Sequence, residues 1–160
     1  MSIFERFTGP ESIKPGEDLI INKGERVALG SATSSKEYRS GSPRMVDVEG
    51  IERSKLSGAA LGIVVTEKGP RFTKLGQNDI YLVPEGGGKS QLPQKMIGNE
   101  FPEAAYERSG YALGVAVELN VPKGSPREYL VLRYGGKHGV GAQDGAKFQL
   151  SLSDRPEGAR

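Results

Sequence analysis

Alternation of large apolar residues with small or polar ones is strictest in residues 111–121. Every odd position there holds tyrosine, leucine or valine, and the even positions hold smaller or polar residues. A period of two is typical of a half-buried β-strand. Residues 122–126, which include two prolines and a glycine, interrupt the pattern, and residues 128–134 resume it. We therefore predict a β-hairpin with a loop of about five residues as the centre of the fold.

Shorter apolar runs predict further strands on both sides of this hairpin. Residues 18–21 and 25–29 flank an Asn-Lys-Gly turn signal, so they are expected to form a first hairpin. Residues 59–66 are apolar on both faces, which predicts a central strand. Residues 102–109 are the one helix candidate, with proline in the first turn and glycine just after the last residue. The remaining strands are expected at residues 45–48, 71–74, 79–83 and 147–153.

Many short strands with one short helix near residues 102–109 predict a mainly all-β fold, an antiparallel β-sandwich or small barrel. We divide the chain into an N-terminal arm (1–16), a single β-rich domain (17–153) and a polar C-terminal tail (154–160).

Two features outside the expected strands are candidates for contact with other molecules. Phe4 and Phe7 in the arm are expected either to pack on their own domain or to contact a neighbouring subunit. Loops are expected at residues 31–44, 84–93 and 135–141, and the first, at about 14 residues, is of a length that is often functional.

Composition narrows the class of protein. The 23 glycines and 10 prolines among 160 residues fit many turns between short strands. The net charge of +2 is too small to indicate nucleic-acid or membrane binding from bulk electrostatics. Because the chain has no cysteine, disulfides, thiolate catalysis and cysteine-ligated zinc are excluded. We see no signal peptide and no apolar stretch of about 18 residues, so we expect cytoplasmic synthesis without membrane insertion.

Two motifs are candidates for sites of chemistry. Residues 86–90 read Gly-Gly-Gly-Lys-Ser, but Val83 stands where a phosphate-binding loop has its first glycine, and Pro93 interrupts the helix that such a loop requires. His138 is the single histidine, and no serine lies in a Gly-x-Ser-x-Gly elbow. We read both motifs as loops without chemistry.

The carboxylates indicate a site of chemistry no more strongly than these two motifs do. Asp47 and Glu49 share one face of an expected strand, but no calcium-loop pattern lies beside them. We therefore expect no catalytic residue, no cofactor, no metal and no enzymatic activity.

Basic and aromatic residues support one alternative function, binding of single-stranded nucleic acid by a β-barrel. Acidic residues near loop 31–44 nearly cancel its positive charge, which argues against this function. The six tyrosines fit core or rim packing better than an open stacking platform. The candidate nucleic-acid contacts are Lys36, Tyr38, Arg39, Arg44 and Lys89.

The favoured expectation is a non-enzymatic structural protein that assembles with copies of itself or within a larger protein assembly. The arm, the expected β core, the long polar loop and the cysteine-free composition indicate it. Residues 57–64 (Ser-Gly-Ala-Ala-Leu-Gly-Ile-Val) faintly resemble a stretch of the head-decoration proteins of tailed phages. That resemblance covers eight residues of simple composition and assigns no family, but it extends the hypothesis to a virion component of the capsid-decoration or tail type.

Overall fold

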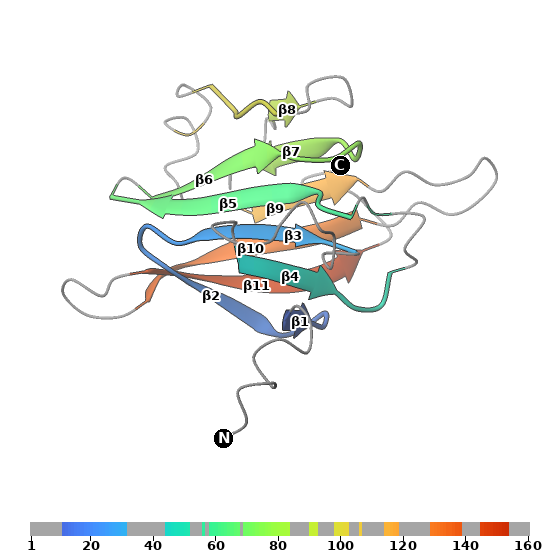
Figure 1. Ribbon diagram of the computed structural model, residues 1–160, viewed down its shortest axis with the longest axis horizontal. Helices are drawn as coiled ribbons and strands as arrows, with labels where there is room; N and C mark the ends of the chain where they lie inside the picture. The colour runs from blue at the N-terminus through green and yellow to red at the C-terminus, as the bar shows by residue number, and fades with distance from the viewer. Residues whose placement is uncertain are drawn as a thin grey trace.

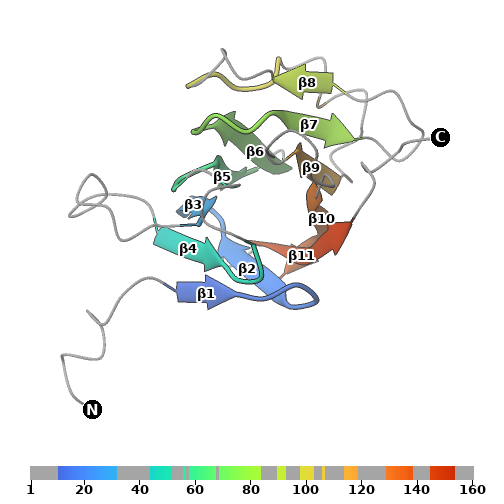
Figure 2. The same cartoon turned by 90° about the vertical axis from the view of Figure 1, so that its right-hand side faces the viewer.

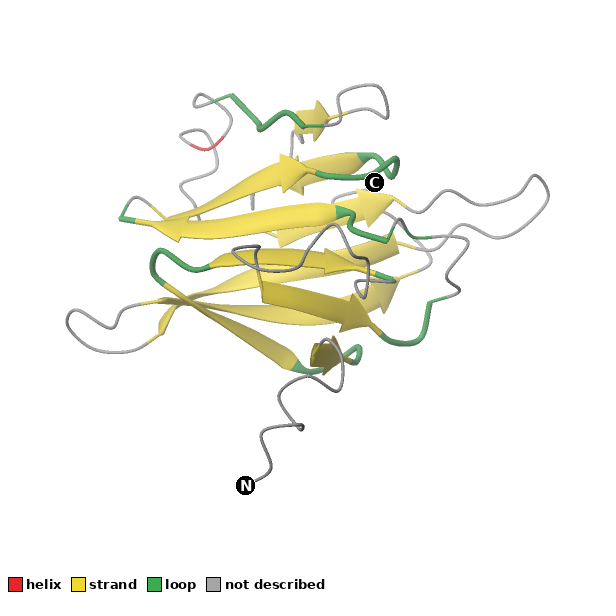
Figure 3. Ribbon diagram, in the orientation of Figure 1, coloured by secondary structure: helices red, strands yellow, loops and turns green. Residues whose placement is uncertain are grey.

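A computed structural model describes residues 11–31, 44–51, 56, 58–67, 69–83, 90–92, 98–102, 106, 114–118, 129–138 and 145–153. These residues form two β-sheets and no helical element, and Tyr106 is the one residue among them with a helical backbone (Figure 3). Sheet A has the strand order β1 (Glu11–Ile13), β4 (Arg44–Val48), β3 (Arg26–Gly30), β5 (Leu61–Thr66) and β6 (Gly69–Lys74). Sheet B has the order β2 (Asp18–Asn22), β11 (Gly145–Ser153), β10 (Tyr129–His138), β9 (Gly114–Glu118), β7 (Ile80–Val83) and β8 (Ser90–Leu92).

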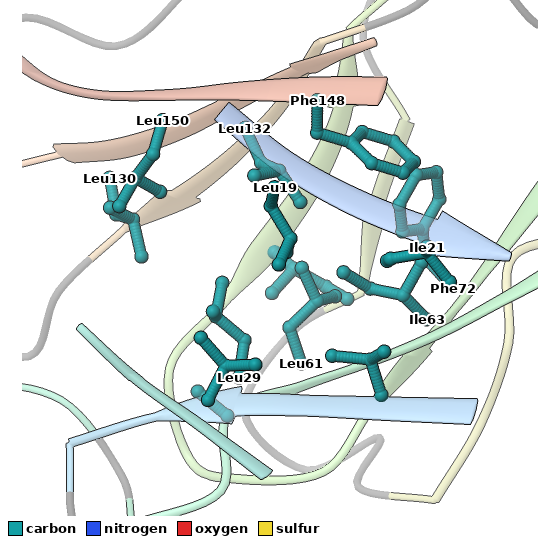
Figure 4. Close-up of a cluster of buried hydrophobic side chains, with 14 of the residues drawn as sticks. Leu19, Ile21, Leu29, Leu61, Ile63, Phe72, Leu130, Leu132, Phe148 and Leu150 are labelled. Atoms are coloured by element: carbon teal, nitrogen blue, oxygen red, sulfur yellow. The ribbon is translucent and has the colours of Figure 1, made fainter. Parts of the chain in front are cut away.

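The two sheets share one hydrophobic core (Figures 2 and 4). Alternate residues of each strand enter it, as in β5, where Leu61, Ile63 and Val65 are buried while the residues between them are partly exposed. Phe72 of sheet A meets Phe148 of sheet B edge to face, with ring centroids 6.1 Å apart. The period-two pattern of the sequence therefore gives each sheet one apolar face, and these faces cover each other.

The predicted central hairpin is confirmed. Strands β9 and β10 pair antiparallel, with Val115 opposite Leu132 and Val117 opposite Leu130. They occupy interior positions of sheet B, between β11 and β7. The predicted final strand is also confirmed as β11, in which Phe148 is buried while alternate residues such as Gln149 are exposed.

The predicted first hairpin is wrong. Strands β2 and β3 are joined by a tight turn in which the Glu25 N–H donates to the Asn22 carbonyl at 2.9 Å and Gly24 has φ of 83°. They nevertheless enter different sheets, because β2 pairs with β11 and β3 pairs with β4 and β5. The turn signal predicts a chain reversal correctly, but strand partners are decided by contacts from distant parts of the chain.

The expectation of purely antiparallel sheets is also wrong. Strand β4 pairs in parallel with both β1 and β3. Two consecutive parallel strands need a connection that returns along the full strand length. The length of the connection after β3 is therefore a requirement of topology, and not by itself evidence of function.

Three predicted boundaries change as well. Residues 90–92, expected within a loop, form β8, and residues 135–138, also expected in a loop, complete β10 after a bulge. Residues 11–13 of the predicted arm form β1, whose Ile13 is buried in the core. Most of the predicted helix at 102–109 lies outside the described residues.

Candidate functional site

The two sheets end side by side at strands β1 and β2, which are edge strands of different sheets (Figures 1 and 2). An open groove of about 480 Å³ lies between them. Its lining comes from β1, from β2 and the residue before it, and from Arg44 at the start of β4. This groove is our candidate functional site, because edge strands of both sheets, which pair with no further strand among the described residues, lie at the same place.

Arg44 links three segments beside the groove. Its Nε and Nη2 donate to the two carboxylate oxygens of Glu11 on β1, at 2.7 and 2.6 Å. Its Nη1 donates to Glu25 Oε1 at 3.0 Å and to the Ile20 carbonyl of β2 at 2.9 Å. The hydrogen bonds and charge of Glu11, followed by those of Glu25, raise the pKa of the Arg44 guanidinium. Arg44 therefore holds β1 and β2 together without any strand pairing between them.

The charge of the groove bears on the nucleic-acid alternative. Glu11, Glu17 and Asp18 contribute three carboxylates to the lining, and Arg44 contributes one guanidinium. Phosphate groups would meet net negative charge at this groove. Arg44, a predicted nucleic-acid contact, is instead bound by two carboxylates and a carbonyl. Nothing at this position favours nucleic-acid binding.

The groove also carries an apolar surface. Ile20 of β2 is 37% exposed and is the one exposed large hydrophobic residue in the described part of the chain. Its neighbours Leu19 and Ile21 are buried in the core, so the alternation of β2 directs Ile20 outward. Ile20 is therefore an outward-facing apolar side chain on an edge strand of sheet B.

The opposite edge of sheet A differs, because other groups of the chain occupy it. The buried Tyr106 hydroxyl accepts the Phe72 N–H at 2.9 Å and donates to the Phe72 carbonyl at 3.3 Å. Lys74 N–H donates to the Asn99 carbonyl at 3.0 Å, and the Lys74 carbonyl accepts the Gly98 N–H at 2.7 Å. The outward backbone groups of Phe72 and Lys74 on β6 are thus satisfied within the chain, unlike the groove end.

A buried lysine lies at this closed edge. The side chain of Lys74 is fully buried, and its Nζ donates to the Asn78 carbonyl. Burial lowers the pKa of Lys74, and the nearby charge of Asp79 acts in the opposite direction. The sequence does contain a signal for this burial, since Lys74 shares the inward face of β6 with Phe72. Full burial and the hydrogen bond to the Asn78 carbonyl are consistent with a structural role for Lys74.

Replacing Lys74 with methionine is expected to change how stability depends on pH. The unfolded lysine keeps its proton up to about its ordinary pKa of 10.5, whereas the folded one releases it at lower pH. Raising the pH through that interval removes the cost of a buried ammonium, so the free energy of unfolding of the unmodified chain rises. The Lys74→Met variant should lack this rise in urea unfolding curves measured from neutral pH toward 10.5.

Lys147→Met is the matched control, because it removes an exposed lysine of β11 and the same formal charge. If the free energy of unfolding changed with pH in the same way for the unmodified chain and for Lys74→Met, this would contradict the conclusion that Lys74 lies in a buried site that disfavours its charged form.

The described part of the chain brings few of the other candidate residues together. His138 and Ser90 lie in strands β10 and β8 and not in loops. Among the described residues, no three histidine, aspartate or glutamate side chains are grouped so that they would hold a metal ion. Tyr81, Tyr106 and Tyr129 are buried, which agrees with core packing. The remaining predicted contacts, Phe4, Phe7, Lys36, Tyr38, Arg39 and Lys89, lie outside the described residues.

Sequence reasoning did not identify the groove residues as a set. Glu11 and Arg44 are 33 positions apart, and Glu25 and Arg44 are 19 apart, so no local motif connects them.

In the described ranges, no helix is long and apolar enough to cross a membrane.

Comparisons with known proteins complete the description of the site. No protein-family model matches the chain. Searches of curated proteins and of solved structures likewise found no match.

Proposed function

We propose that this chain is a non-enzymatic structural subunit that assembles with copies of itself through the groove between β1 and β2. Ile20 is the observation that supports this proposal most directly, because its exposed apolar side chain lies on an edge strand of sheet B. In this proposal the two sheets act as the layers of a β-sandwich that presents the groove at one end. The larger assembly is a virion, in which this chain is a component of the capsid-decoration or tail type.

The arrangement of edges favours one end of the molecule for subunit contact. At β6 the outward groups of Phe72 and Lys74 are bonded within the chain, so that edge has little to offer a partner. At β2 the Ile20 carbonyl is bound by the Arg44 side chain, which is partly exposed and can be displaced. Residues 1–10, with Phe4 and Phe7, immediately precede in sequence the strand β1, which lines the groove.

The test is the native mass, measured by light scattering on a sizing column with absorbance read at two wavelengths that separate protein from nucleic acid. We expect a discrete multimer free of nucleic acid. Ile20→Asp should reduce it to a monomer, because a charge in a buried apolar contact carries a large desolvation cost. Phe4→Ala combined with Phe7→Ala should shift the mass in the same direction through loss of arm contacts.

Val64→Asp is the matched control. Val64 is a partly exposed β-branched residue on the outer face of sheet A, and its cross-strand partners Arg26 and Arg71 can accommodate a carboxylate. It should leave the multimer intact. A monomeric unmodified chain would contradict self-assembly, and an Ile20→Asp multimer would exclude the groove as the contact. Nucleic acid that co-purifies and dissociates with added salt would favour the alternative function.

A further inference from the structure

We propose that strand β1 is exchanged between copies of this chain, so that β1 of one copy pairs with β4 of another. This inference rests on the proposed self-assembly and names the segment that carries it. The partner is therefore a second copy of the chain, and the docking site is the edge of β4, with Arg44, that β1 leaves when it opens.

Strand β1 is held in place by a small number of contacts. It has three residues, of which Ile13 alone is buried, and it pairs with one neighbour. Its other contacts include the pair of hydrogen bonds between Glu11 and Arg44, whose side chains are 46% and 28% exposed, and the Glu49 N–H, which donates to the Ile13 carbonyl at 2.9 Å. Segments with few buried contacts open locally much more often than the whole domain unfolds. β1 can therefore leave β4 while the core stays folded.

The connection from β1 to β2 has the features of a hinge. It contains Pro15 and Gly16, and Gly16 has φ of 95°. The part after the hinge is fixed on β11, because Gly16 N–H donates to the Leu150 carbonyl at 2.6 Å and the Glu17 carbonyl accepts the Leu150 N–H at 3.1 Å. The part before it is held by a turn in which the Glu17 N–H donates to the Lys14 carbonyl at 3.0 Å. Opening this turn frees β1 while β2 remains in place.

A second copy offers the same docking site. The parallel register places Glu11 opposite Val46, Ser12 opposite Asp47 and Ile13 opposite Val48. An exchanged β1 repeats every one of these contacts, including the Glu11–Arg44 pair, so exchange within an assembly loses only the hydrogen bonds of the hinge turn. The contact between copies at the groove, with Ile20, then favours the exchanged form over the monomer.

Charge reversal tests this proposal directly. Glu11→Arg alone and Arg44→Glu alone each place like charges together, both within one copy and between identical copies. When the two variants are mixed, reciprocal exchange pairs opposite charges at both docking sites. We expect each variant alone to lose the multimer and the mixture to regain it, with heteromeric species in native mass spectrometry. A mixture that stays as two separate homogeneous species would overturn the proposal.

A disulfide test is independent of these charges and covers the case in which Arg44→Glu fails to fold. The chain has no cysteine, so introduced thiols have no native competitors. Ser12→Cys and Asp47→Cys, prepared as separate variants, cannot form this disulfide within one copy. Mixed and oxidised, they should give a Ser12–Asp47 cross-linked peptide at least ten times more abundant than the Val64→Cys and Arg71→Cys control pair in β5 and β6.

The two proposals fail in different ways. A multimeric unmodified chain without exchange would overturn the β1 inference and leave self-assembly standing. A monomeric unmodified chain would overturn the proposed function itself.

Discussion

Alanine at position 145 is expected to destabilise the fold by about 3 kcal/mol, near the upper end of the usual cost of overpacking. Gly145 begins β11, directly opposite Asn22 of β2. A Cβ at this position would overlap the Ile21 carbonyl oxygen and lie 3.0 Å from the Asn22 Cα. Because the obstructing atoms belong to the backbone, β2 has to move away from β11, and no side-chain rotation relieves the contact.

Urea unfolding of Gly145→Ala measures this loss of stability, and hydrogen exchange of the β2 amides reports whether the loss is located in β2. Gly62→Ala is the control, because its Cβ would meet the flexible end of Leu75 at 3.3 Å and its cost should stay below about 1 kcal/mol. Equal stability of the two variants would show that β2 and β11 are not this close.

Phe148→Ala is expected to cost about 3–5 kcal/mol, the range for removing a buried aromatic side chain. Phe148 is fully buried and contacts Phe72 of sheet A at 6.1 Å and Tyr134 of its own sheet at 5.5 Å between ring centroids. Its removal leaves a cavity between the two sheets. Gln149→Ala, on the exposed face of the same strand, should change stability by no more than about 0.5 kcal/mol.

A double-mutant cycle separates the contact between the sheets from the loss of buried area. Phe72→Leu and Phe148→Leu, made singly and together, should show a coupling of about 0.5–1.5 kcal/mol in urea unfolding. The coupling reports contact between sheet A and sheet B, since each ring belongs to one of them. Strictly additive losses would contradict the packing of the two sheets on each other.

Local sequence patterns predicted several of the strands, because an alternating or continuous run of apolar residues marks each of them in the sequence. This holds for β5, for β11 and for the β9–β10 pair. Pairing was harder to predict. The turn at residues 22–25 predicted a hairpin, yet β2 binds β11, more than a hundred residues further along the chain. No local pattern carries that information, since the partner is selected by how the two apolar faces pack together.

The candidate site was predictable only in part. Arg44 was expected to contact nucleic acid because it is basic and belongs to a polar segment. Its carboxylate partners reach it through the parallel pairing of β1 with β4 and the turn before β3, which the sequence does not reveal. At Gly145, the close approach of β2 explains why a side chain is excluded.

The occupied edge of β6 limits the geometry of any shared sheet. A fibril that extends sheet A from molecule to molecule needs two open edges on every molecule. Tyr106 and the backbone of residues 98 and 99 fill one of them. When two molecules join through their β1 edges, sheet A has no matching edge left for a third. Pairing through this sheet, in the proposed assembly, would therefore be self-limiting with two-fold symmetry, and a larger shell would require other surfaces.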